Sequence, residues 1–126
     1  MSSDTEAKIK QDLLAEIQVL EQNYKVLAGF ILGTDYDPIT VGNCIQTFKD
    51  SLSRASAYVL ALYNLKGRRV NIPWDPLFTS LDYALATLSV SAKVKQREAV
   101  RTILAMSREQ MAQVISYFVA LKESLK

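Results

Sequence analysis

The sequence predicts an all-α fold: an antiparallel up-down bundle of four to five helices, forming a single domain over residues 1–126. Apolar residues recur at steps of three and four over long stretches, as they do on one face of an α-helix. The chain has only 3 Pro and 4 Gly, so few positions interrupt a helix. No useful length of sequence alternates between apolar and polar residues, so no strand is predicted. Short connections favour antiparallel packing of consecutive helices.

The first helix is predicted over residues 4–32. Ser3 and Glu6 fit the capping box S-x-x-E, in which two side chains satisfy free backbone donors at a helix start. Gly33 is placed to follow the C-terminal end, where glycine is the usual residue. The predicted buried face consists of Ile9, Leu13, Ile17, Leu20, Tyr24, Leu27 and Ile31.

The second helix is predicted to begin at Asp37-Pro38. An Asp side chain can cap the first turn, and a proline at the next position loses no backbone hydrogen bond. The helix should end near Lys66, because Gly67 follows. Its predicted buried face has the most regular spacing in the chain and consists of Val41, Ile45, Phe48, Leu52, Ala55, Val59 and Leu62.

An extended connection over residues 68–76 precedes a third helix, which Asp75-Pro76 should start and which should end near Val90. Its predicted buried face consists of Leu77, Leu81, Leu85 and Leu88. Trp74 lies in the connection between two prolines. We interpret it as a plug over one end of the bundle, and stacking on a nucleic-acid base is the alternative interpretation.

The last helical segment is predicted over residues 93–125. Ser107 and Gln110 could form a second capping box, which would divide the segment into two helices that meet near Met106. The predicted buried face consists of Leu104, Met111, Val114, Phe118, Leu121 and Leu125.

The net charge of +2 hides an uneven distribution. Residues 1–50 hold 4 basic and 8 acidic residues, a net charge of −4, whereas residues 51–126 hold 11 basic and 5 acidic residues, a net charge of +6. The basic residues of the second half form two clusters. One consists of Lys66, Arg68 and Arg69, and the other of Lys93, Lys95, Arg97, Arg101 and Arg108.

These basic clusters are the candidate nucleic-acid-binding residues. Lys93, Arg97 and Arg101 recur at steps of four, and such a stripe can follow a line of phosphates without reading base sequence. Two other interpretations remain open: a solvated helix face, or contact with an acidic protein surface. That surface could be the acidic first helix of a neighbouring copy, with Asp4, Glu6, Asp12, Glu16 and Glu21.

Composition argues against most enzyme classes. The chain has no His and one Cys, which excludes a Ser-His-Asp or Cys-His site and leaves too few ligands for an ordinary zinc site. A single cysteine cannot form a disulfide within the chain, and Cys44 is expected to be a buried small residue. Asp35 and Asp37 could ligate a hard cation, but helix capping explains them better. We therefore expect no catalytic residue, metal or cofactor.

The sequence contains neither a signal-peptide pattern nor an apolar run near the ~20 residues that a membrane span needs. We therefore expect a soluble cytoplasmic protein with no membrane partner.

The basic loop over residues 66–69 and the basic stripe over residues 93–108, set beside an acidic first helix, give the chain an architecture that resembles the small helical subunits of CRISPR effector complexes. That resemblance implies a non-catalytic subunit that stacks along a nucleoprotein of antiviral defence, with basic surfaces toward the nucleic acid. It also implies other subunits of the assembly as partners, for which further copies of this chain are one option.

Two functions follow as hypotheses. The first is a subunit of a nucleoprotein assembly that contacts phosphate backbone through the basic residues of the second half. The second is a helical adaptor that binds a partner protein and does not contact nucleic acid.

Overall fold

The computed structural model describes residues 3–65, 67, 83, 85 and 97–125. Four α-helices have described bounds, the separate residues Tyr83 and Leu85 are also helical, and none of the described residues is in a strand. The four helices are α1 (Ser3–Ile31), α2 (Pro38–Leu65), α4 (Arg97–Met106) and α5 (Arg108–Leu125). The predicted all-α fold is confirmed.

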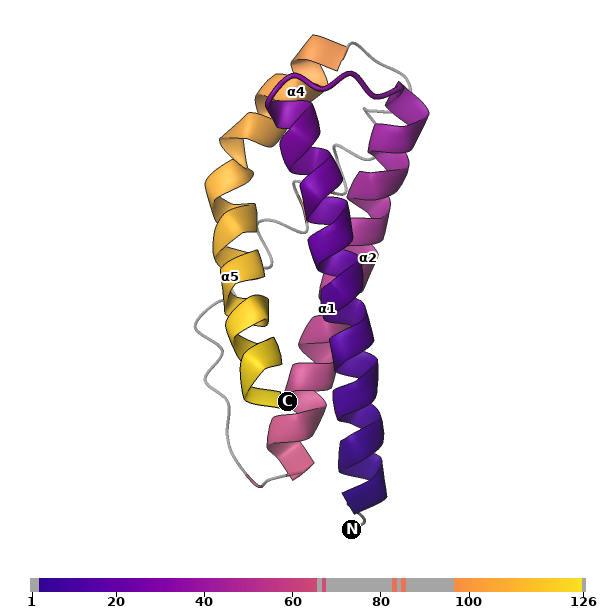
Figure 1. The fold of residues 1–126 in the computed structure, drawn as a ribbon, viewed down its shortest axis with the longest axis vertical. Coiled ribbons are helices and arrows are strands. Elements are labelled where there is room, and N and C mark those ends of the chain that lie inside the picture. Colours follow the sequence, from indigo (N-terminus) through magenta and orange to yellow (C-terminus); the bar gives the residue numbers. More distant parts are fainter. Residues whose placement is uncertain (1–2, 66, 68–82, 84, 86–96, 126) are drawn as a thin grey trace.

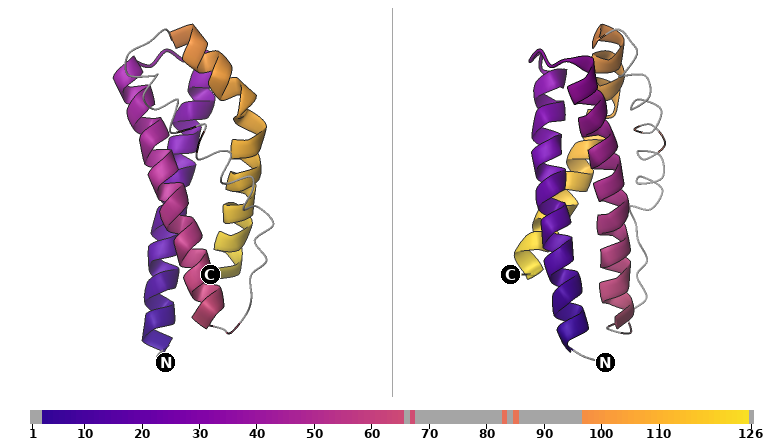
Figure 2. Two further views of the ribbon diagram at one scale, coloured as in Figure 1. Left: turned by 180° about the vertical axis from the view of Figure 1, so that it is seen from behind. Right: turned by 90° about the vertical axis from the view of Figure 1, so that its right-hand side faces the viewer.

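Helix α1 is the central element of the described fold. Its most extensive contact is with α2, and it also packs against α4 and α5. Both α2 and α5 run antiparallel to α1, while the short α4 lies across the end of the bundle where α1 terminates (Figures 1 and 2). The arrangement agrees with the predicted antiparallel bundle.

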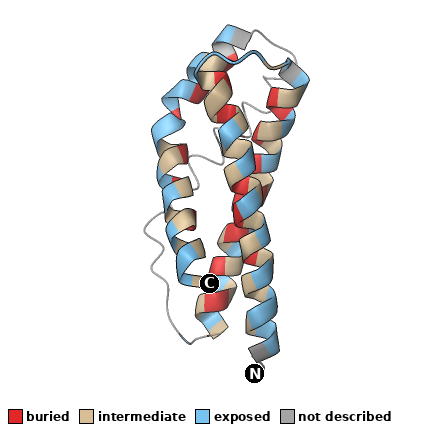
Figure 3. Cartoon of the chain, viewed as in Figure 1, coloured by how far each residue is buried: buried red, intermediate tan, exposed pale blue. Residues whose placement is uncertain are grey.

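The core lies along the faces that these helices turn toward one another (Figure 3). All seven predicted core positions of α2 are buried, from Val41 to Leu62. In α1, four predicted positions are buried and the other three pack partly buried against the core. Phe30 and Val100 are also buried, although the predicted faces did not include them.

Helix α1 ends in a two-bond glycine cap. Gly33 has a φ of 111°, in the region that side chains other than glycine rarely adopt. The backbone N–H of Gly33 donates to the Phe30 carbonyl at 3.1 Å, and the N–H of Thr34 donates to the Gly29 carbonyl at 2.9 Å. These bonds form a Schellman motif, so the predicted C-terminal glycine is confirmed.

Asp37 caps the start of α2, as the sequence predicts. Its carboxylate accepts hydrogen bonds from the Thr40 backbone N–H at 2.8 Å and from the Thr40 hydroxyl at 2.6 Å. These bonds favour the charged carboxylate and lower the pKa of Asp37 below its ordinary value. Capping therefore accounts for Asp37 without a bound cation.

The last helical segment divides in two where the sequence suggests. Helix α4 ends at Met106 and α5 begins at Arg108, with Ser107 buried between them. The Met111 backbone N–H donates to the Ser107 carbonyl at 3.0 Å, which starts the hydrogen bonding of α5.

The predicted third helix and the connection that holds Trp74 lie outside the described residues, except for Tyr83 and Leu85. Both of these are helical. Leu85 is completely buried in the same core as the four helices, which agrees with its predicted place on a buried face.

Candidate functional site

The predicted nucleic-acid-binding residues are only partly covered by the structure. Five of them lie outside the described residues: Lys66, Arg68, Arg69, Lys93 and Lys95. Arg97 is the first residue of α4, and Arg108 is an exposed residue that begins α5. Arg101 is one turn beyond Arg97 in α4, and it is the predicted residue whose contacts the structure describes in most detail.

Arg101 is bound to the C-terminal end of α1. Its Nε donates to the Phe30 carbonyl at 2.7 Å, and one of its Nη atoms lies 3.5 Å from the Thr34 carbonyl. The guanidinium carbon lies 4.6 Å from the centre of the Phe30 ring, within the range of a cation–π contact. Glu98, one turn earlier in α4, accepts a hydrogen bond from the remaining side of the guanidinium.

These contacts give Arg101 a structural role. The carbonyls at a helix C-terminus carry partial negative charge, which a nearby cation stabilises. The last turn of α1 contains no basic residue of its own, so Arg101 supplies that cation from α4. With only 19% of its side chain exposed, Arg101 has little surface to offer a phosphate, and its assignment to a nucleic-acid interface remains a prediction that these contacts do not favour.

Most described cations are paired with the chain's own carboxylates. The structure describes eight Lys and Arg side chains, and in six of them a nitrogen lies within 4.0 Å of a carboxylate oxygen. The pairs are Lys8–Asp12, Lys10–Glu6, Lys49–Asp50, Arg54–Glu16, Arg101–Glu98 and Lys122–Glu21. Lys25 and Arg108 complete the set, and both are exposed.

Two of these pairs hold helices together. Glu16 of α1 pairs with Arg54 of α2, and its carboxylate also accepts a hydrogen bond at 2.8 Å from the fully buried Ser51 hydroxyl. Glu21 of α1 accepts a hydrogen bond from Lys122 of α5 at 2.7 Å. The bond with Glu16 raises the pKa of Arg54 above its ordinary value.

The acidic side chains of α1 are therefore engaged within the fold. Five acidic residues of this helix were candidates for a surface that contacts a neighbouring copy. Four of these residues are ion-paired within the chain, namely Glu6, Asp12, Glu16 and Glu21. A contact between copies through this acidic face would compete with these pairs, so the structure does not favour that interpretation.

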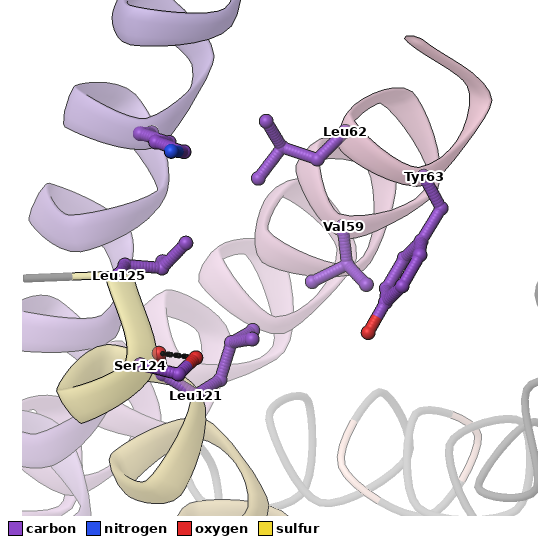
Figure 4. Close-up of a pocket in the computed structure, with 7 residues that line it drawn as sticks. Val59, Leu62, Tyr63, Leu121, Ser124 and Leu125 are labelled. Carbon is purple, nitrogen blue, oxygen red and sulfur yellow. Dashed lines mark hydrogen bonds between the residues drawn. The ribbon is translucent and has the colours of Figure 1, made fainter. Parts of the chain in front are cut away.

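A pocket of about 200 Å³ lies where α1, α2 and α5 meet near the C-terminal ends of α2 and α5. Val59, Leu62 and Tyr63 of α2 face Leu121 and Leu125 of α5 across it (Figure 4). Among the described residues, Lys10 of α1 and Ser124 of α5 also line it. The Ser124 hydroxyl donates to the Leu121 carbonyl at 2.8 Å, so its hydrogen is used within α5.

A second, larger concavity of about 480 Å³ lies between α1 and α5. Polar and charged residues supply most of its described lining residues, among them Gln18, Gln22 and Lys25. Of its three charged side chains, Glu21 and Lys122 bind each other. Leu14 is the one aliphatic side chain among the described residues that line this concavity, whereas four aliphatic side chains line the first pocket.

Burial favours the neutral form of two titratable groups beside the core, Tyr117 and Cys44. Burial, with a smaller contribution from the nearby Tyr63, raises the pKa of Tyr117 to about 12. Burial also raises the pKa of the Cys44 thiol, and a protonated thiol is a poor nucleophile. Neither residue is suited to act as a base or nucleophile near neutral pH.

Within the part of the chain that the structure describes, no three His, Cys, Asp or Glu side chains are grouped closely enough to hold a metal ion. Among the same residues, no helix combines the length and the apolar character that crossing a membrane requires.

No protein-family model matches the chain, and no curated protein or solved structure is significantly similar to it.

Proposed function

We propose that the chain is a non-catalytic helical adaptor that binds a partner protein without nucleic acid. The observation that supports this function best is that three of the described cations, Arg54, Arg101 and Lys122, are each bound to another helix of the chain. A phosphate-binding surface needs cations that exchange small counterions for phosphates. A protein partner can dock instead on a surface of mixed charge that has an apolar centre.

A subunit of a nucleoprotein assembly, as in the resemblance to CRISPR small subunits, is the competing hypothesis. It depends mainly on Lys66, Arg68, Arg69, Lys93 and Lys95, which lie outside the described residues. It loses support at Arg101, whose guanidinium is already bound to α1.

Fluorescence anisotropy with short labelled single-stranded and double-stranded oligonucleotides separates the two hypotheses. For an adaptor we expect no saturable binding at a physiological ionic strength of about 0.15 M. Saturable binding at this ionic strength would contradict the adaptor function if it depended on salt as phosphate binding does. In that case the logarithm of the binding constant falls with the logarithm of the salt concentration, with a slope of about 0.7 per phosphate contact on a single strand.

The matched variants are the double substitution Lys66→Glu/Arg69→Glu and the control Lys8→Glu. If the chain is a nucleoprotein subunit, the double variant should bind oligonucleotides more weakly and with a flatter salt dependence, whereas Lys8→Glu should bind as the wild type does. The reason is that contacts with the phosphate backbone of the nucleic acid supply the binding. Arg101 is left unchanged, since its substitution would disturb the end of α1 as well as any phosphate contact.

A further inference from the structure

The pocket between α2 and α5 has the size and the walls of a site for a single apolar group. Val59, Leu62, Leu121 and Leu125 line it with aliphatic carbon. Its volume of about 200 Å³ exceeds the roughly 150 Å³ of an apolar protein cavity that admits benzene. One aromatic side chain would therefore fit.

Lys10 adds a positive charge to this apolar pocket. It lines the pocket from α1, and 35% of its side chain is exposed. Its nitrogen lies 3.5 Å from Glu6, one turn earlier, whereas the Lys122–Glu21 distance is 2.7 Å. Because a partly exposed pair between residues four apart on one helix is weak, Lys10 can turn to a second carboxylate at little cost.

We propose that this pocket receives an aromatic side chain of a partner protein, with a carboxylate beside it that binds Lys10. The inference rests on the adaptor function proposed above and names the chemistry of the partner's contact. Interfaces commonly place an aromatic anchor in a pocket and surround it with weaker polar contacts. The pocket is smaller than the roughly 300–1,000 Å³ typical of small-molecule sites, which favours a side chain over a cofactor.

The direct test is an NMR titration of the purified chain with N-acetylphenylalanine, which has a ring beside a free carboxylate. We expect saturable shifts of backbone amides at the C-terminal ends of α2 and α5. N-acetylphenylalanine amide, which lacks the charge, should bind about threefold to fivefold more weakly, as for the loss of one exposed ion pair.

Two matched pairs of variants locate the binding. Lys10→Gln should remove the preference for the carboxylate, whereas Lys8→Gln, on the exposed side of α1, should keep it. Ser124→Phe places a ring at the pocket from an exposed position and should abolish binding. Ser116→Phe, also exposed on α5 but outside the pocket lining, should leave binding unchanged. Circular dichroism of each variant checks that the helices are intact.

Three outcomes would overturn the inference: no saturable shifts, equal effects of Ser124→Phe and Ser116→Phe, or tight binding of octanoate with none of N-acetylphenylalanine. The last result would assign the pocket to a free acid. Failure of this titration leaves the adaptor function standing, because that function is judged separately by oligonucleotide binding and by capture of a partner.

Discussion

Phe48→Ala is expected to lower the free energy of unfolding by about 3–5 kcal/mol. Phe48 is completely buried in α2 and belongs to the common core of the bundle. Its truncation removes apolar contacts and leaves a cavity that the surrounding helices can only partly fill. Urea denaturation followed by circular dichroism measures the change.

Leu60→Ala is the control for Phe48→Ala. Leu60 is also on α2, but 39% of it is exposed, so its truncation should cost much less. Equal costs for the two variants would mean that the buried face of α2 is assigned wrongly.

Arg101→Ala is expected to destabilise the chain by about 2 kcal/mol. Hydrogen bonds that involve a charged group contribute about 1.5–3 kcal/mol in proteins, and the Arg101 side chain is 19% exposed. The variant loses the bond to the Phe30 carbonyl, the contact over the Phe30 ring and the cation at the end of α1. Arg101→Lys should recover only part of the stability, because lysine has no planar guanidinium to satisfy several partners.

Arg108→Ala is the matched control, since Arg108 is exposed at the start of α5. It should change the free energy of unfolding by no more than about 0.5 kcal/mol in either direction. If Arg101→Ala were equally mild, the proposed role of Arg101 at the end of α1 would be wrong.

Local sequence signals predicted the described helices and three of their boundaries well. Asp37-Pro38 marked the start of α2, Gly33 marked the end of α1, and Ser107 marked the division between α4 and α5. Each signal concerns hydrogen bonds of backbone groups that lie within a few residues of it. No knowledge of tertiary packing is therefore needed to interpret it. The apolar spacing identified the buried faces for the same reason.

The contacts of Arg101 could not be predicted in this way. Arg101 follows Val100 and therefore lies at the edge of the buried face of α4. The spacing of apolar residues does not show which other element contacts that edge. The partner is the end of α1, 71 residues away along the chain. A stripe of basic residues looks the same in sequence whether it faces solvent or another helix.

The pocket could not be predicted from the sequence either. Val59, Leu62, Leu121 and Leu125 were all predicted to lie on buried faces, and the spacing cannot show that α2 and α5 leave room between them. Lys10 gave no signal of its own, because it joins the pocket only through the packing of α1. Such a site depends on how three helices meet at the end of the bundle.

Capture of a partner from extracts of expressing cells, with and without nuclease, tests the adaptor function most directly. Three baits are used in parallel: the wild-type chain, Ser124→Phe and Ser116→Phe. Each captured protein is then purified, and its affinity for each of the three baits is measured by titration. The adaptor function predicts a partner that survives nuclease treatment, binds the purified wild-type chain and Ser116→Phe alike, and loses affinity for Ser124→Phe. A partner that binds all three baits equally would support the adaptor function but would show that the contact lies outside the pocket. Release of every partner by nuclease, with recovery on adding back nucleic acid, would contradict the adaptor function and favour a nucleoprotein subunit.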